Sequence, residues 1–287
     1  MTRGLRELLM VKRIRYGISI LVSLTILSLI VILSSPFEYD QISYNIHLPP
    51  FSRSNSTWPH ILGTDSIGRD VFTRVLYAFI LDVNCGLAVV ALSGLIGLII
   101  GLISGYLGGI IDSVLMMIMD IVISIPGFML AIAITAVLGS SIINAIIAVV
   151  IVTIPVYARL VRGLVLSVKE NLYILAAREA GLSGLKIITK HILPQVTPIF
   201  ITQATIELGN AILYIAALSF IGLGAQEPTP EWGLMISTAR RFIREAWWPA
   251  VFPGIFMFLT ILSFNLIGDG LRDYLDPKKR LSTGGLS

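Results

Sequence analysis

Long apolar runs separated by short polar segments organise this chain. Six runs, at about residues 16–34, 83–107, 112–138, 142–163, 196–223 and 249–268, are long enough to cross a bilayer. A helix needs about 20 apolar residues for this. None of the runs alternates between apolar and polar positions, as the strands of a membrane β-barrel do. Because a helix satisfies its own backbone hydrogen bonds in lipid, the pattern predicts an all-α, polytopic membrane protein with six transmembrane helices.

Composition supports this assignment, and the basic residues orient the chain. The 287 residues are 55% hydrophobic and 13% charged, which is too little charge to cover a soluble domain of this length. Of the 21 basic residues, 15 lie before the first run, after the sixth, or in and beside the segment between the fourth and fifth runs. The positive-inside rule places those three segments in the cytoplasm. We therefore expect a multi-pass protein of the cell membrane with both termini cytoplasmic.

The same pattern divides the chain into five parts. They are a cytoplasmic head (1–15), a first transmembrane helix (16–34), an extracytoplasmic loop (35–82), a five-helix core (83–268) with a cytoplasmic loop (164–195), and a cytoplasmic tail (269–287). The first run lacks an A-x-A-like cleavage site and is long for a signal peptide, which indicates an uncleaved helix. Asn55 begins a glycosylation sequon, relevant only in a host that glycosylates. A single cysteine, Cys85, excludes an intrachain disulfide.

Glycine and proline modify three of the predicted helices. Gly97, Gly101 and Gly105 recur at every fourth position of the second run, on one face where a neighbouring backbone can approach closely. Tight helix packing is the simplest interpretation, and a gating hinge is the alternative. Pro126 and Pro155 interrupt the third and fourth runs. Each removes a backbone donor and predicts a kink.

The segment AAREAGLSGLKIITKHILP, residues 176–194, has the pattern of two short helices. Its polar face has the spacing i, i+4, i+7 and i+11, at Glu179, Ser183, Lys186 and Lys190. The opposite, mostly apolar face includes Leu182, Leu185, Ile188 and Ile192. Gly181 predicts a tight turn, Ser183 a cap on the second helix and Pro194 its end. We interpret the segment as a rigid protein-docking knob, with an amphipathic helix on anionic lipid as the alternative.

This segment also resembles the cytoplasmic loop of the permease subunits of binding-protein-dependent ABC importers. That loop reads E-A-A-x-x-x-G and closes on an aliphatic residue followed by Leu-Pro. The matching residues here are Ala176, Ala177, Gly181, Ile192, Leu193 and Pro194, whereas Leu175 replaces the glutamate. In the family this loop is the coupling helix, which sits in a cleft of the ATPase subunit. The resemblance implies ATPase-coupling roles for Ala176, Ala177, Glu179, Gly181, Leu182, Ser183, Lys186, His191 and Pro194.

Further stretches resemble the C-type permease of the dipeptide, oligopeptide and nickel subfamily. They are HILGTDSIGRDVFTR (60–74), GYLGGIID (105–112), AALSFIGLGAQEPTPEWGLM (216–235) and FPGIFMFLTILSFNLIGDGLRDYLDP (252–277). Two departures lie near the presumed pathway. Ile215 replaces a glutamate that is frequent in the family, and AFILDV (78–83) replaces GARVSL.

The resemblance implies a permease that imports di- or oligopeptides by alternating access, with nickel complexes and oligosaccharides as alternative substrates. The implied partners are a second, homologous permease, one or two ABC ATPase subunits, an extracytoplasmic solute-binding protein and membrane lipid, and no nucleic acid. Because the chain has no G-x-x-x-x-G-K-[ST] sequence, we expect no enzyme activity and no cofactor on it, with ATP and Mg on the partner ATPase. A self-contained secondary carrier is the alternative from another class.

Ionisable residues inside the predicted helices mark a candidate translocation pathway, because charge is costly in lipid. The candidates are Asp120, Glu207 and, one turn from Glu207, Asn210. Glu207 would favour an amine-bearing or cationic substrate, and a hydrogen bond to another helix or to the partner permease is the alternative. Asp82 lies at the outer edge of the second run, where we expect a solvated carboxylate.

The extracytoplasmic stretch GTDSIGRD lacks the ligand order of a calcium loop, and we predict neither a metal site nor a catalytic residue in the chain. We expect a structured turn with internal ion pairs, formed by Thr64, Asp65, Gly68, Arg69 and Asp70. Docking of an extracytoplasmic binding protein is the functional alternative for these residues.

Overall fold

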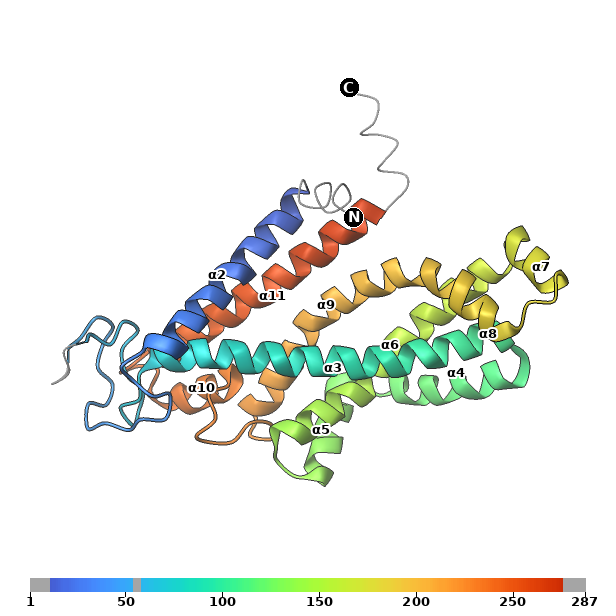
Figure 1. Ribbon diagram of the computed structural model, residues 1–287. Helices are drawn as coiled ribbons and strands as arrows, with labels where there is room; N and C mark the ends of the chain where they lie inside the picture. The colour runs from blue at the N-terminus through green and yellow to red at the C-terminus, as the bar shows by residue number, and fades with distance from the viewer. Residues whose placement is uncertain (1–10, 54–57, 276–287) are drawn as a thin grey trace, which may run out of the picture.

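The computed structural model describes residues 11–53 and 58–275, which are almost entirely helical (Figure 1). Within them, β structure is limited to two isolated bridges, Ser52 with His60 and Thr64 with Asp70. The first ten residues, the sequon at Asn55 and the tail from residue 276 lie outside the described residues. The predicted all-α fold is confirmed.

Within the part of the chain that the structure describes, five helical segments are long and apolar enough to cross a membrane. They are α2 (Lys12–Ser34), α3 (Val71–Leu107), α6 (Ile142–Lys169), α8 continued into α9 (Gly184–Phe220), and α11 (Trp248–Leu275). The predicted third run is two helices, α4 (Gly109–Ser124) and α5 (Gly127–Leu138), bent by 88° and counting as a sixth span if taken as one. The break follows from Pro126, because Ile125 before it adopts the extended backbone that a following proline favours.

The central helix α3 packs against α6 and α9, and α2 runs beside α11 (Figure 1). α3 begins at Val71, well before the predicted start at residue 83. Asp70 accounts for this start, because its carboxylate accepts the N–H of Thr73 at 2.7 Å and caps the helix. Residues 71–82, predicted as the end of a loop, are therefore helical.

The glycine stripe of α3 lies against α6. A Cβ atom on Gly97, Gly101 or Gly105 would come within 2.5–2.7 Å of the Cβ atoms of Tyr157, Val161 and Val165. Side chains larger than hydrogen have no room there, which confirms tight helix packing. Pro155 lies inside α6 without ending it, since the helix continues from Ile142 to Lys169.

Two shorter helical regions lie at opposite ends of the long helices (Figure 1). One end carries α7 (Leu172–Glu179) and α8 (Gly184–Ile187), and the other carries α10 (Trp232–Ala239) with a 3-10 turn (Arg240–Phe242). A π-helix (Ile188–Ile192) joins α8 to α9 (Leu193–Phe220), so the helix does not end at Pro194 as predicted. Proline is tolerated in the first turn of a helix, where its missing N–H needs no partner. The π-helix before it has i→i+5 hydrogen bonds and ends where α9 begins.

Candidate functional site

The α7–α8 cap, residues 171–192, is held on the bundle by three isoleucines. Ile174, Ile187 and Ile192 are fully buried and pack with Val161 and Val165 of α6. Each fills the interior from a different element of the cap: α7, α8 and the π-helix. The cap is therefore a packed structure and not a loose loop.

The predicted coupling residues belong to this cap, except Pro194, which lies in the first turn of α9. Ala176, Glu179, Gly181, Ser183, Lys186 and Pro194 are exposed, and Ala177, Leu182 and His191 are half-buried. Three leucines are exposed beside them: Leu172 at 84%, Leu175 at 40% and Leu185 at 73%. Leu185, on the predicted apolar face, is exposed, whereas Ile187 is buried. The cap thus exposes both charged and apolar side chains.

A tight turn connects α7 and α8, as predicted. Gly181 has φ +77°, a left-handed conformation that favours glycine. The N–H of Leu182 donates to the carbonyl of Ala177 at 3.1 Å, which closes the end of α7. Ser183 precedes α8, but its hydroxyl makes no capping bond. Its carbonyl accepts the N–H of Ile187 at 3.0 Å instead, so the predicted side-chain cap is wrong.

Tyr106 links the cap to the end of α3, a contact that the sequence analysis did not identify. The guanidinium of Arg178 lies over its ring at 5.7 Å from the centroid. A Cβ on Gly184 would lie 3.0 Å from the same ring. Lys169 also reaches α3, because its Nζ donates to the carbonyl of Gly105 at 3.0 Å. A displacement of the cap would therefore act on α3.

The candidate pathway residues do not form one cluster. Asp120 of α4 pairs with Arg159 of α6 at 2.5 Å, and both side chains are about half exposed. Glu207 accepts hydrogen bonds from Gln203 at 2.9 Å and from Asn210 at 3.2 Å. Both donors belong to α9 itself, so the described residues provide no helix-to-helix bond for Glu207. Glu207 and Asn210 are thus brought together, and Asp120 stands apart from them.

An apolar cavity of about 320 Å³ lies farther along α9, toward α10. Its lining includes Phe128, Leu213, Ala217, Phe220, Gly233 and Met257. These residues come from α5, α9, α10 and α11. The polar group around Glu207 and this apolar cavity therefore follow one another along α9.

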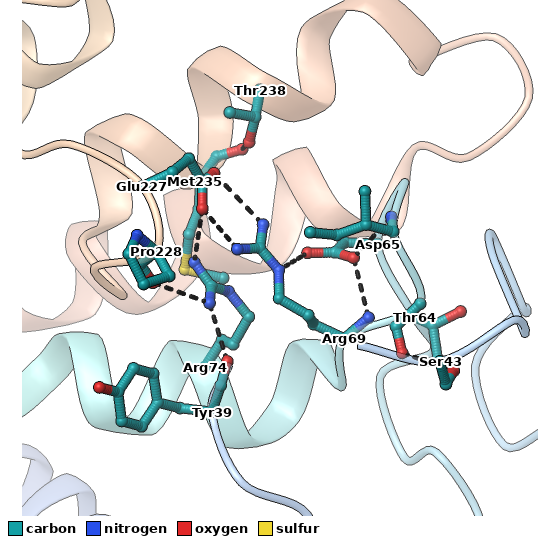
Figure 2. Close-up of polar contacts among 12 residues, drawn as sticks. Tyr39, Ser43, Thr64, Asp65, Arg69, Arg74, Glu227, Pro228, Met235 and Thr238 are labelled. Atoms are coloured by element: carbon teal, nitrogen blue, oxygen red, sulfur yellow. Dashed lines mark hydrogen bonds and ion pairs between the residues drawn. The ribbon is translucent and has the colours of Figure 1, made fainter. Parts of the chain in front are cut away.

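At the α10 end of the bundle, Arg69 lies at the centre of an ion-pair cluster (Figure 2). Its Nε donates to Asp65 at 2.6 Å, and its two terminal nitrogens donate to the carboxylate of Glu227. Burial lowers the pKa of Arg69, but the hydrogen bond to Glu227 and the charge of Asp65 outweigh it, so the net pKa is raised. The cluster joins segments far apart in sequence.

The other residues of the predicted external turn are also buried. The hydroxyl of Thr64 donates to the carbonyl of Asn45 at 2.6 Å, and Asp70 contacts His60 at 2.8 Å. Gly68 is buried against Ser43 with φ +79°. These contacts match the expected structured turn with internal ion pairs. A binding protein would have to reach other residues, because these side chains are shielded.

Arg74, which the sequence analysis did not single out, extends the same cluster (Figure 2). It is 1% exposed, and its guanidinium donates to the carbonyls of Tyr39 at 2.8 Å and Pro228 at 3.2 Å. The available signal was one basic residue inside the otherwise mostly apolar stretch VFTRVLYAFI (71–80). Its partners lie too far along the chain for a local pattern to identify.

Asp82 is buried, contrary to the expected solvated position. Its side chain is 2% exposed, and one carboxylate oxygen accepts the N–H of Trp232 at 3.1 Å. Glu231, also buried, accepts the N–H groups of Gly233 at 3.0 Å and Leu234 at 2.7 Å and so caps α10. Burial raises the pKa of Glu231 to about 7. The expected solvation of Asp82 was wrong because α10, which lies far along the chain, covers this part of α3 in the folded protein.

Sequence relatives of this chain are transport permeases. It is 44% identical over 221 residues to the dipeptide transport system permease protein DppC of Alkalihalophilus pseudofirmus, covering 77% of this chain and 73% of that protein. It is 45% identical over 242 residues to the glutathione transport system permease protein GsiD of Escherichia coli O1:K1, covering 84% and 77%. These similarities agree with the resemblance stated from the motifs.

Among solved structures, the MetNI methionine ABC transporter, described as inward-facing, matches with a TM-score of 0.51 at 22% identity. The match covers 70% of this chain and 98% of that chain and concerns the fold alone. A family model, that of the inner membrane component of binding-protein-dependent transport systems, matches residues 97–281. The chain therefore belongs to the family of inner membrane components of binding-protein-dependent transport systems.

Proposed function

We propose that this chain is one of two permeases of an ATP-driven importer of di- or oligopeptides. The substrate class is supported by the identity of 44–45% to permeases named for dipeptide and glutathione transport. A solute-binding protein would deliver the peptide, and a second, homologous permease would complete the pathway. ATP and Mg would bind to one or two separate ATPase subunits.

The α7–α8 cap is the proposed ATPase contact. The observation that supports this contact is that the cap exposes both apolar side chains (Leu172, Leu175 and Leu185) and charged ones (Glu179 and Lys186), while its isoleucines are buried against the bundle. Exposed leucines beside charged groups suit a protein interface whose apolar centre is surrounded by polar contacts. In the proposed orientation the cap and both termini are cytoplasmic, and the Arg69 cluster is extracytoplasmic.

Alternating access then needs a mechanical connection from the cap to the spans. The contacts of Arg178 and of Gly184 with the ring of Tyr106 provide one, because Tyr106 belongs to α3. ATP binding favours the outward form only if the ATPase binds the cap more tightly in that form. The proposed pathway lies along α9, past Glu207 and Asn210.

Substitution of Gly181 by tryptophan tests the coupling. Gly181 has open space around it, so a large side chain adds bulk at the tip of the cap. We expect ATP hydrolysis without peptide uptake when the variant is assembled with its partner subunits in liposomes. Gly139→Trp is the matched control, because Gly139 also has a positive φ, +94°, and open space but lies between α5 and α6.

Retained uptake in the Gly181 variant would rule out the cap as the coupling element. The broader assignment has a separate test, which is purification of the chain from its native membrane with its bound partners. An ATPase, a second permease and a binding protein are expected with it. Uptake by the purified chain alone, without ATP, would instead identify a self-contained carrier.

A further inference from the structure

Two carboxyl groups are buried together where α3 meets the start of α10. Asp82 of α3 is 2% exposed, and Glu231 is fully buried. The two are neighbours, because the N–H that Asp82 accepts belongs to Trp232, the residue next to Glu231. Two negative charges so placed repel each other and are costly in a low-dielectric interior.

The hydrogen bonds favour a charge on Glu231 and not on Asp82. Both carboxylate oxygens of Glu231 accept backbone N–H groups at the start of α10, and the hydroxyl of Ser219 is a further polar neighbour. Asp82 accepts one N–H through Oδ2, and its Oδ1 is buried without a hydrogen-bond partner. An ionised Asp82 would leave a charged oxygen without a donor.

The surroundings contain no compensating cation within the described residues. No salt bridge there involves either carboxylate. The remaining titratable neighbour is Cys85, one turn along α3, which lies within the field of both groups. From α9, the polar side chain near the two carboxyl groups is Ser219. The side chains of α11 in this core, such as Phe264, are apolar. The described groups also include no cluster of three or more side chains able to hold a metal ion.

We propose that Asp82 and Glu231 form a proton-binding site that holds at least one proton, carried by Asp82, and that this proton keeps α10 packed against α3. The site and the apolar cavity along α9 share the helix α10, since Gly233 and Ile236 of α10 line that cavity. Loss of the proton would place two like charges at the junction and weaken the contact of α10 with α3. Occupancy of the site would thus control the position of one cavity wall.

Infrared difference spectroscopy on the full chain in lipid nanodiscs tests the proton directly. Wild type minus Asp82→Asn, recorded just above neutral pH, should show loss of one carbonyl band of a protonated carboxylic acid. Asp112→Asn is the matched control, because Asp112 is ion-paired with Arg162 and should lose a carboxylate band instead. Loss of a carboxylate band in the Asp82 variant would overturn the assignment.

Two further measurements keep the assignment testable if the Asp82 variant does not fold. Wild-type protein labelled with ¹³C at the aspartate carboxyl should show one protonated acid band that shifts with the label, and its absence would also overturn the site. In Glu231→Gln, that band should disappear at a lower pH than in wild type, because the neighbouring negative charge is gone. An unchanged titration would show that the two groups do not share a site.

Discussion

Asp112 of α4 accepts two hydrogen bonds from the guanidinium of Arg162 of α6, at 2.6 and 2.7 Å. Ser104 of α3 donates to the same carboxylate, so three helices meet at one group. Lys169 contacts α3 close by, at the carbonyl of Gly105. The junction fixes the start of α4 to the pair of helices that carries the α7–α8 cap.

Removal of this carboxylate should destabilise the protein. We expect Asp112→Ala to reduce the free energy of unfolding by about 1–3 kcal/mol, because charged hydrogen bonds are lost and Arg162 is left without its partner. Thermal unfolding in detergent measures the change. Asp120→Ala is the control, since the Asp120–Arg159 pair is far more exposed and should contribute below ~1 kcal/mol. Equal effects would contradict a special role for Asp112.

The glycine stripe gives a second prediction. A methyl group on Gly101 would lie 2.6 Å from the Cβ of Val161 and 2.7 Å from the carbonyl oxygen of Ala158. Gly101→Ala should therefore separate α3 from α6 and cost about 1–3 kcal/mol. Gly163→Ala in α6 has open space around it and should be neutral or stabilising by up to about 1 kcal/mol. Equal changes in melting temperature for Gly101→Ala and Gly163→Ala would argue against helix packing as the reason for the glycine stripe.

Arg69 should be essential for the α10 end of the fold. Arg69→Met leaves the buried carboxylate of Asp65 without its partner, which costs about 3–5 kcal/mol for a buried pair. Arg69→Lys keeps the charge but loses the forked geometry toward Glu227. Its stability should therefore lie between that of wild type and that of Arg69→Met. Arg241→Met, at an exposed position, is the control and should change the melting temperature little. A tolerated methionine at position 69 would refute a structural role for the cluster.

Glu231 should make stability depend on pH. Burial raises its pKa from 4.5 to about 7, so the native state keeps a proton that the unfolded chain has already released. The stability from this group is full below the unfolded pKa and is lost as pH rises through about 7. The melting temperature of wild type should fall over this window. Glu231→Gln should remove that fall, whereas the exposed Glu245→Gln should retain it.

Glu207 should affect the choice of substrate if the peptide passes along α9. Glu207→Gln keeps the side-chain shape but removes the charge that Gln203 and Asn210 hold in place. We expect uptake of a cationic peptide to fall about tenfold, the effect of ~1.4 kcal/mol, with uptake of a neutral peptide nearly unchanged. Asp120→Asn is the control, because Asp120 is neutralised by Arg159. Equal loss for both peptides would indicate a structural role for Glu207.

Local patterns predicted much of the fold and part of the candidate site. The turn at Gly181 and the regular spacing of Gly97, Gly101 and Gly105 are local patterns, so the sequence alone indicated them. That the three glycines pack against α6 came from the structure. The start of α3 was misplaced because Arg74 gives the first turns a loop-like polarity. Arg74 is nevertheless buried, with partners at Tyr39 and Pro228.

The sequence by itself determined the helical class, the approximate spans, the family resemblance and the two-helix cap, because apolar period, turn residues and motifs are local properties. Only the tertiary structure decided which polar groups are buried. Asp82 looks solvated in the sequence but is covered by α10, about 150 residues later in the chain. The surroundings of a charge depend on what packs against it in space, and that information lies in no single stretch of the chain.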